Sequence, residues 1–290
     1  VDFSVVGKPP ITTSKTFADT VCPCCGGPAR RETDTMDTFV CSSWYYLRYA
    51  DANNANAPFD KALANKWLPV DQYVGGIEHA ILHLLYSRFF TKAMKDLGLL
   101  SFDEPFKNLL TQGMVLKDGS KMSKSKGNTV DPDEIFENYG ADTARLFILS
   151  DSPPARDFDW SDAGVEGCYK FLNRVWRLVS DNFDHLTRDY KLSFPLSREN
   201  DDLVRTVHMA IKGITNDISN DFQFNTVISR YREFTNAIYD WRNKKSDLND
   251  EDKAVLSFAT TTLIRLMSPV TVFMADEIWQ ELGAKKSIHD

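Results

Sequence analysis

The chain has 290 residues, with 34 lysines and arginines against 41 aspartates and glutamates, so its formal net charge is −7. Apolar residues make up 42% and charged residues 26%, which excludes a wholly disordered or fibrous chain and is ordinary for folded domains. Because no apolar stretch is long enough to span a bilayer, we expect no membrane partner. The acidic balance also argues against a general DNA-binding protein.

Residues 1–35 are predicted to form an irregular segment that contains a cysteine-rich knuckle. Three of the five cysteines, Cys22, Cys24 and Cys25, lie in this one turn. Cys22 and Cys25 have the spacing of half a zinc site, but a structural zinc needs four ligands and no second pair follows. We therefore do not expect zinc. The unpaired cysteines favour a reducing compartment, and we expect a cytoplasmic protein.

Residues 36–155 alternate between strand and helix patterns, which predicts an α/β fold with a parallel sheet. A strand is expected over 71–74, a long helix from about 78 to 97, and a second strand over 108–116. Asp118-Gly119 is a tight-turn signal. Asp131-Pro132 predicts a helix start, and Gly140 is expected to end that helix before another begins at Ala141.

Residues 156–290 read almost entirely as helix after the break at Ser152-Pro153-Pro154. Apolar residues recur at helical spacing in five stretches, which predicts an antiparallel helical bundle. The first stripe is expected to run through Val165, Cys168, Tyr169, Leu172, Trp176 and Val179. Lys170, Arg174 and Arg177 recur on the opposite face, which is ordinarily a solvated face.

The densest cluster of chemistry-bearing residues is Lys121-Met122-Ser123-Lys124-Ser125-Lys126-Gly127-Asn128. Its lysines are separated by small polar residues, so their ammonium groups can close over a polyphosphate with charge-assisted hydrogen bonds. Charge that develops on the phosphates in a transition state would be stabilised by the same lysines. The alternative is a solvated basic loop without a ligand.

Two further groups of candidate residues lie between the predicted strand and helix. Gly75 and Gly76 allow the backbone to approach a ligand, and Glu78 can accept hydrogen bonds from ribose hydroxyls. The alternative is an ordinary strand-to-helix turn, with Glu78 favoured by the helix dipole. His79 and His83 are expected on one helix face, where a metal is disfavoured because no glutamate lies between them.

Short sequence motifs are more informative about this chain than its composition. Lys121-Met122-Ser123-Lys124-Ser125 resembles the second signature motif of class I aminoacyl-tRNA synthetases. The flanking segments 33–39, 42–49, 75–86, 112–116, 139–147 and 160–179 resemble the bacterial-type leucyl-tRNA synthetases. The resemblance covers nearly the whole chain. Cys41 departs from it, because an acidic residue is expected there in many relatives.

The resemblance implies roles for individual residues. The ATP ribose and adenine would contact Gly75, Gly76 and Glu78, with Met114 and Val115 against the purine edge. His79 and His83 would line the amino-acid and adenylate pocket, so that both bind the substrate and His79 also meets the nucleotide. The ATP phosphates would meet the motif from Lys121 through Met122, Ser123, Lys124 and Ser125. Of these residues, Lys121 and Lys124 would be catalytic.

The resemblance also implies an organisation and a function. The expected fold is the second half of a Rossmann-like sheet over 36–155, followed by an anticodon-binding-type helical bundle over 156–290. The function would be that of a leucine–tRNA ligase, with ATP, leucine and tRNA(Leu) as partners, Mg²⁺ accompanying the nucleotide and no metal site in the protein. The His-Ile-Gly-His first motif and the editing domain do not occur in the sequence. We therefore expect a fragment that is inactive alone.

Three alternatives stay open from the sequence. The first is a class I synthetase for valine, isoleucine or methionine, although the Glu78-His79 pair followed by His83 favours leucine. The second is a non-catalytic RNA-binding module built from the bundle. The third is a free-standing nucleotidylyltransferase that uses the lysine loop.

Overall fold

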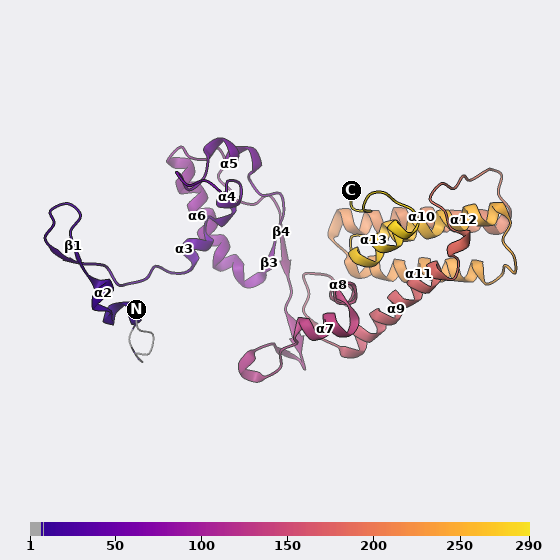
Figure 1. Cartoon of the computed structure of the whole chain (residues 1–290), viewed down its shortest axis with the longest axis horizontal. Coiled ribbons are helices and arrows are strands. Elements are labelled where there is room, and N and C mark those ends of the chain that lie inside the picture. The colour runs from indigo at the N-terminus through magenta and orange to yellow at the C-terminus, as the bar shows by residue number, and fades with distance from the viewer. Residues whose placement is uncertain (1–6, 8) are drawn as a thin grey trace. The chain divides into compact units, whose positions relative to one another are not determined.

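The computed structural model describes residue 7 and residues 9–290, apart from the side chains of 220 and 221. The chain divides into two compact units (Figure 1). Of the described part, the first contains residue 7 and residues 9–73 and 78–109, and the second contains 74–77 and 110–290. The domain boundaries at 35/36 and 155/156 stay predictions.

The first unit is built from short helices and one hairpin. Its small core contains Tyr46, Leu47, Phe59, Ala64 and Leu100. Where the sequence predicts an irregular segment, two one-turn helices lead into an antiparallel hairpin, whose strands pair Asp19 with Arg30 and Val21 with Pro28. The elements of this part of the chain are α1 (Pro10–Thr13), α2 (Lys15–Ala18), β1 (Asp19–Val21), β2 (Pro28–Arg30), α3 (Phe39–Ser42), α4 (Tyr45–Tyr49), α5 (Lys61–Trp67), η1 (Ile77–Ile81) and α6 (His83–Asp96).

The long helix expected from about 78 to 97 is interrupted. A 3₁₀ turn, η1, precedes α6, and Leu82 between them has φ −116° and ψ −97°, outside the helical region. Gly98, with φ +74°, follows the end of α6 as the sequence predicts. Ion pairs then tie α6 to the next loop, with Arg88 and Lys92 on Glu104 and Lys95 on Asp103.

Two strands lie where the chain passes between the units. β3 (Tyr73–Gly76) pairs with β4 (Leu109–Gln112) in a two-stranded sheet. The strand predicted over 71–74 is thus displaced by two residues, and the glycine pair lies inside it. The strand predicted over 108–116 is divided in two, since β4 ends at Gln112 and β5 (Val115–Lys117) begins after Gly113 and Met114.

A three-stranded sheet in the second unit carries the lysine loop. β5 pairs antiparallel with β6 (Ser120–Lys121) and parallel with β7 (Phe158–Asp159). Asp118 and Gly119 make the hairpin turn with φ values of +55° and +67°. Two successive positive φ values favour an Asp-Gly pair, so the predicted turn is confirmed. The parallel β5–β7 pair agrees with the predicted fold class.

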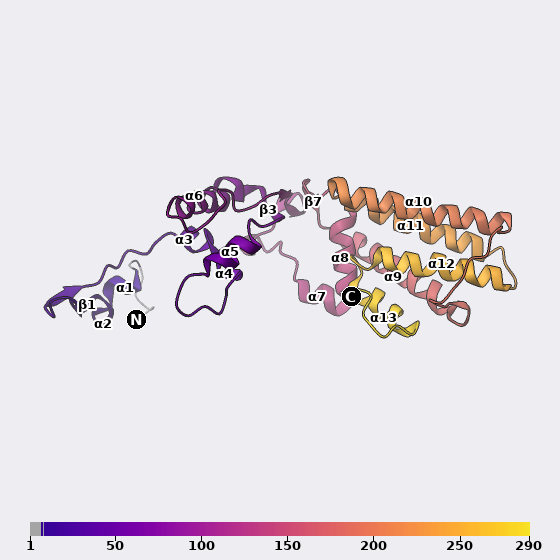
Figure 2. The same cartoon turned by 90° about the horizontal axis from the view of Figure 1, so that it is seen from above.

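The helices of the second unit form the bundle seen in both views (Figures 1 and 2). Capping side chains fix where several of them begin. The carboxylate of Asp131 accepts from the N–H of Asp133 at the start of α7, and Asn249 and Asp252 form a capping box on α12. The elements are η2 (Lys124–Lys126), α7 (Pro132–Tyr139), α8 (Ala141–Ser150), α9 (Asp162–Ser180), η3 (Phe183–His185), α10 (Arg198–Asp221), α11 (Phe224–Arg242), α12 (Asp250–Met267) and α13 (Val272–Glu281).

The bundle core extends beyond the predicted helical segment. Leu146 and Phe147 of α8 are buried in it together with α9 to α13. The apolar stripe expected along α9 is partly wrong, because Tyr169 and Trp176 are 40% and 43% exposed while Phe171 and Val175 are buried. Among the described residues, no helix has the length and apolar character needed to cross a membrane.

Candidate active site

The lysine loop, residues 121–128, is a short segment that connects β6 to α7. Lys121 ends β6, and Lys124 begins the 3₁₀ turn η2, which closes at Gly127 with φ +65°. Inside the turn, the Ser123 and Ser125 hydroxyl oxygens lie 2.7 Å apart. Lys121, Lys124 and Lys126 are all exposed. The loop therefore presents cationic side chains on a defined backbone, as a polyphosphate site requires.

Asn128 organises this loop, a role that the sequence analysis did not assign. Its side-chain oxygen accepts from the N–H of Ser123 at 2.9 Å, and its amide donates to the Lys121 carbonyl at 3.3 Å. One side chain thus ties Asn128 to the first and third residues of the motif. A polar residue directly after the loop glycine was the available signal, because asparagine readily bonds nearby backbone groups.

Two aspartates at β7 hold the other edge of the same small sheet. Asp157 accepts from the Met114 N–H at 2.6 Å, and Asp159 accepts from the Gly119 N–H at 3.0 Å. These contacts join positions about 40 residues apart, which is why local sequence patterns did not reveal them. They fix the start of β5 and its hairpin turn, and thereby the base of the lysine loop.

Gly113 and Met114 lie in the tight connection between β4 and β5. A Cβ atom on Gly113 would lie 2.1 Å from the carbonyl carbon of Arg156, so only glycine fits. The Met114 carbonyl accepts from the Phe158 N–H at 3.1 Å, while its N–H is held by Asp157. Both main-chain groups of Met114 are therefore engaged within the unit. The predicted contact of Met114 and Val115 with a purine edge stays a prediction, and at the Met114 N–H it requires displacing Asp157.

The glycine pair and Glu78 stand at the end of β3. Gly75 and Gly76 are partly buried within the strand, and Glu78 is exposed in η1. The local elements differ from the prediction, because a 3₁₀ turn replaces the first helical turn. The proposed contacts with the ATP ribose stay predictions.

His79 and His83 meet in the first unit, though not on one α-helical face. His79 belongs to η1 and His83 begins α6, and their ring centroids are 6.1 Å apart. Four groups surround the buried His83 ring: Tyr45 and Tyr73 at 5.5 Å, Phe106 at 6.0 Å and His79. The two histidines are therefore neighbours, but the prediction that they share one helix face is wrong. Their roles in substrate binding stay predictions.

Two ring nitrogens of this pair are buried without a hydrogen-bond partner among the described residues. They are Nδ1 of His79 and Nε2 of His83, while Nδ1 of His83 lies 3.1 Å from the Ser87 hydroxyl. Burial lowers the pKa of His83, and the neighbouring His79 lowers it further. A neutral imidazole with an unsatisfied polar atom is a group that a polar ligand can satisfy.

Within the described residues, no group of three or more histidine, cysteine, aspartate or glutamate side chains is arranged to hold a metal ion. The histidine pair and the lysine loop belong to different units. The chain thus carries a pair of neighbouring histidines in one unit and a cationic loop in the other.

The basic row of α9 is partly occupied by contacts within the protein. Lys170 pairs with Glu166 at 2.7 Å, and the Arg174 guanidinium lies 4.6 Å from the centre of the Tyr239 ring. With Arg177, these residues border a hollow of about 620 Å³. The row lies on the solvent face as predicted, and part of its charge serves the packing of α9 on α11.

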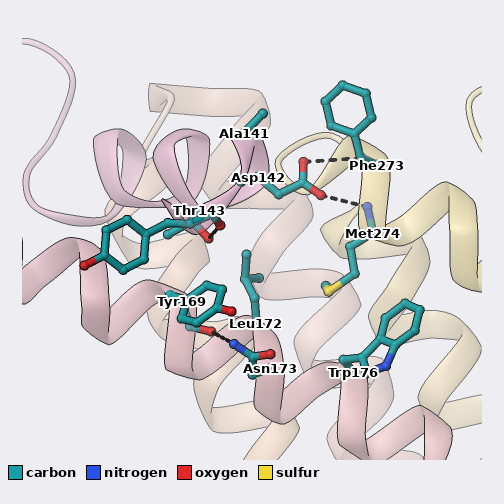
Figure 3. A pocket seen from close by; sticks show the side chains of 11 residues that line it. Ala141, Asp142, Thr143, Tyr169, Leu172, Asn173, Trp176, Phe273 and Met274 are labelled. Atoms are coloured by element: carbon teal, nitrogen blue, oxygen red, sulfur yellow. Dashed lines mark hydrogen bonds between the residues drawn. The ribbon is translucent and has the colours of Figure 1, made fainter. Parts of the chain in front are cut away.

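A second hollow of about 310 Å³ lies between α8, α9 and α13 (Figure 3). Tyr169 and Trp176 line it from α9, Phe273 and Met274 line it from α13, and the Phe273 ring points away from the others. Asp142 of α8 also lines it. Its walls are mainly apolar. It is formed by the bundle, and none of the predicted nucleotide-binding residues lines it.

The chain matches two protein-family models and several known proteins. Residues 12–161 match tRNA synthetases class I (I, L, M and V), and residues 200–290 match the anticodon-binding domain of tRNA ligase. The whole chain aligns with the leucine–tRNA ligase of Symbiobacterium thermophilum at 48% identity over 316 positions, which is 37% of that protein.

Solved structures agree with these matches. The ternary complex of Agrobacterium radiobacter K84 agnB2 LeuRS with tRNA and LeuAMS has a TM-score of 0.86 and 38% identity, covering 96% of this chain and 36% of that one. A Mycobacterium tuberculosis methionyl-tRNA synthetase bound by methionyl-adenylate shares the fold, with a TM-score of 0.62, 18% identity, and coverage of 83% of this chain and 49% of that one. The chain thus spans little more than a third of its leucine-specific relatives.

The sequence resemblance is therefore confirmed for the family, and the role of the lysine loop stays a prediction. The chain belongs to the class I tRNA synthetases of the isoleucine, leucine, methionine and valine group.

Proposed function

We propose that this chain supplies the lysine-loop half of the active site, and the helical bundle, of a leucine–tRNA ligase. The observation that carries the proposal is the 48% identity to a leucine–tRNA ligase along the whole chain. Identity at that level extends through both family domains, so it supports leucine rather than valine, isoleucine or methionine. The reaction would join leucine and ATP to leucyl-adenylate and then charge tRNA(Leu) in the cytoplasm.

The lysine loop is proposed to act in the first step. The leucine carboxylate attacks the α-phosphorus of ATP, and pyrophosphate leaves. Negative charge on the phosphate oxygens then faces Lys121 and Lys124, whose ammonium groups stabilise it more in the transition state than in the ground state. Mg²⁺ accompanies the nucleotide. The same loop contributes Met122, Ser123 and Ser125 to the phosphate site, and Asn128 holds its backbone.

The remaining predicted residues would place the other parts of the substrates. Gly75, Gly76 and Glu78 are proposed for the adenosine, with Met114 and Val115 nearby in the same role. His79 and His83 are proposed for the amino acid and the adenylate. Their support is a pair of buried ring nitrogens, one on each histidine, for which the described residues supply no hydrogen-bond partner and which a bound polar group would satisfy. The bundle and its Lys170, Arg174 and Arg177 row are proposed for contact with tRNA phosphates.

A hybrid enzyme tests the proposal directly. Residues 1–290 replace the aligned segment of the Symbiobacterium thermophilum leucine–tRNA ligase, and leucine-dependent ATP–pyrophosphate exchange and tRNA(Leu) charging are measured. We expect both activities, with leucine preferred over isoleucine, valine and methionine. A folded hybrid that activates one of the other three amino acids instead would contradict the leucine assignment.

Two lysines of the loop provide a matched comparison in that hybrid. Lys124→Ala is expected to slow adenylate formation by about a hundredfold or more, as loss of one preorganised donor does. Leucine affinity should hardly change, because the lysine addresses phosphates. Lys126→Ala, which removes an exposed lysine two residues on and outside the motif, is expected to have a much smaller effect. Equal rates for the two variants would remove Lys124 from the catalytic residues.

A further inference from the structure

Three cysteines crowd the turn of the β1–β2 hairpin, away in sequence from all the proposed substrate-binding residues. The turn is closed by two hydrogen bonds, from the Cys22 N–H to the Gly27 carbonyl at 2.8 Å and from the Gly26 N–H to the Cys22 carbonyl at 2.9 Å. Gly26 takes a φ of +71°, which only a residue without a Cβ adopts readily. The backbone from Cys22 to Gly27 is thus held in one tight reversal.

This reversal pairs Cys22 with Gly27 across the turn. The pKa of the Cys22 thiol is lowered, mainly by hydrogen bonding to the backbone of Cys25 and Cys24 and also by their thiols. The Cys25 sulfur lies over the inside of the turn, 3.6 Å from the point where a Cβ on Gly27 would stand. Cys24 and Cys25 are exposed, and Cys22 is half-buried, so reagents can reach the cluster.

Two chemistries suit such a cluster, and the geometry favours one of them. A structural metal needs four protein ligands, and the described residues contain no convergent group of three. A dithiol needs only two sulfurs within reach. Cys22 and Cys25 have the two-residue spacing of redox-active pairs, in which one thiolate is stabilised by its surroundings. Pairing of Cys22 with Cys24, or of Cys24 with Cys25, would close a much tighter ring.

We propose that Cys22 and Cys25 form a reversible disulfide by exchange with a small disulfide such as oxidised glutathione. The Cys22 thiolate attacks one sulfur of the reagent, and the first glutathione leaves as a thiolate that takes up the proton Cys22 had lost. The Cys25 thiolate then attacks the Cys22 sulfur of the mixed disulfide and releases the second glutathione. The protein loses two hydrogen atoms and the reagent gains them. This site is independent of the proposed ligase activity.

The test uses the purified chain in a defined mixture of reduced and oxidised glutathione. After the remaining thiols are alkylated, intact mass should show three alkylated cysteines and a protein lighter by two hydrogen atoms, without bound glutathione. Peptide mapping should join Cys22 to Cys25. In short alkylation pulses of the reduced protein, Cys22 should react several-fold faster than Cys41, an exposed cysteine outside the turn.

Variants within the turn separate the two roles. Cys25→Ser should trap Cys22 as a mixed disulfide with glutathione, because the second thiol is missing. Cys22→Ser should abolish the internal disulfide. Cys24→Ser is the matched control and should retain it.

Three outcomes would overturn the proposal: five reactive thiols after oxidation, a disulfide between other cysteines, or one zinc ion retained per reduced chain and lost in Cys22→Ser. Circular dichroism checks that each variant is folded. If a variant does not fold, the disulfide mapping of the protein without substitutions still tests the proposal.

Discussion

At the scale of single residues, the base of the lysine loop depends on one glycine that cannot be replaced by a larger residue and on two aspartates that bind backbone N–H groups. Gly113 fits against the backbone of Arg156, and Asp157 and Asp159 hold the strand and the turn that lead into the loop. None of these residues carries charge toward a phosphate. They fix instead the position of the backbone that leads to Lys121 and Lys124, so their contribution to the site is geometric.

Replacing Gly113 with alanine should destabilise the second unit strongly. The added Cβ would overlap the Arg156 carbonyl group, so the backbone of β5 or β7 must shift, at a cost of at least about 2 kcal/mol. Gly167, inside α9 with open space around it, is the matched control. Gly167→Ala should stabilise by roughly 0.5–1 kcal/mol through helix propensity. Urea unfolding of both variants measures the difference, and equal effects would contradict the close approach at Gly113.

His83 should make the first unit sensitive to mild acid. Its pKa is lowered by burial, so the unfolded chain binds a proton more readily than the folded one. The stability that the neutral ring provides is complete above pH of about 6.5 and is lost as the pH falls below that, by at most about 1.4 kcal/mol per pH unit. Hydrogen exchange of the α6 amides, corrected for intrinsic rates, should show this slope.

Two variants check that assignment. His83→Gln should remove the part of the slope that belongs to position 83. His185→Gln, which changes a histidine of the second unit, should keep it. An unchanged slope in His83→Gln would place the titrating group elsewhere.

At the scale of elements, the sequence predicted what is encoded within a few residues. The Asp118-Gly119 turn, the start of α7 at Asp131-Pro132 and its end at Gly140 are confirmed because turn and cap chemistry is local. The break before α6 was missed because a 3₁₀ turn and an α-helix share apolar spacing over five residues. The division of 108–116 into two strands follows from a contact with Arg156, which no local pattern reveals.

The lysine loop should loosen when Asn128 is removed. Asn128→Ala deletes the acceptor for the Ser123 N–H and the donor to the Lys121 carbonyl, each worth about 1 kcal/mol. We expect the Ser123 amide to exchange about tenfold faster or more, with little change in overall stability, and slower adenylate formation in the hybrid enzyme. Asn138→Ala, which removes an exposed bond to the Glu134 carbonyl in α7, is the control. Unchanged exchange at Ser123 would show that Asn128 does not order the loop.

At the scale of the whole molecule, the second unit joins the lysine loop and the bundle through α8. Arg145 of α8 donates to the Val270 and Pro269 carbonyls, and Asp142 accepts from the N–H groups of Phe273 and Met274 at the start of α13 (Figure 3). The boundary predicted from Ser152-Pro153-Pro154 rests on a real break in secondary structure. Side-chain contacts nevertheless cross that break and join α8 to the bundle. The sequence did not predict them, because contacts between residues more than 120 positions apart leave no periodic signal.

Cutting the chain on either side of α8 should therefore give different results. Residues 130–290 keep α7 and α8 and should melt cooperatively. Residues 156–290 lose Leu146 and Phe147, which are 0% and 2% exposed, and large buried side chains are each worth roughly 2–5 kcal/mol. They also leave the first N–H groups of α13 without the Asp142 carboxylate. Since whole domains are stable by only about 5–15 kcal/mol, the shorter chain should melt broadly and at lower temperature.

Ile148→Ala in the longer chain, at a position 48% exposed on the same helix, should leave its melting nearly unchanged. If residues 156–290 melt as sharply and as high as residues 130–290, α8 is not part of the bundle's cooperative core.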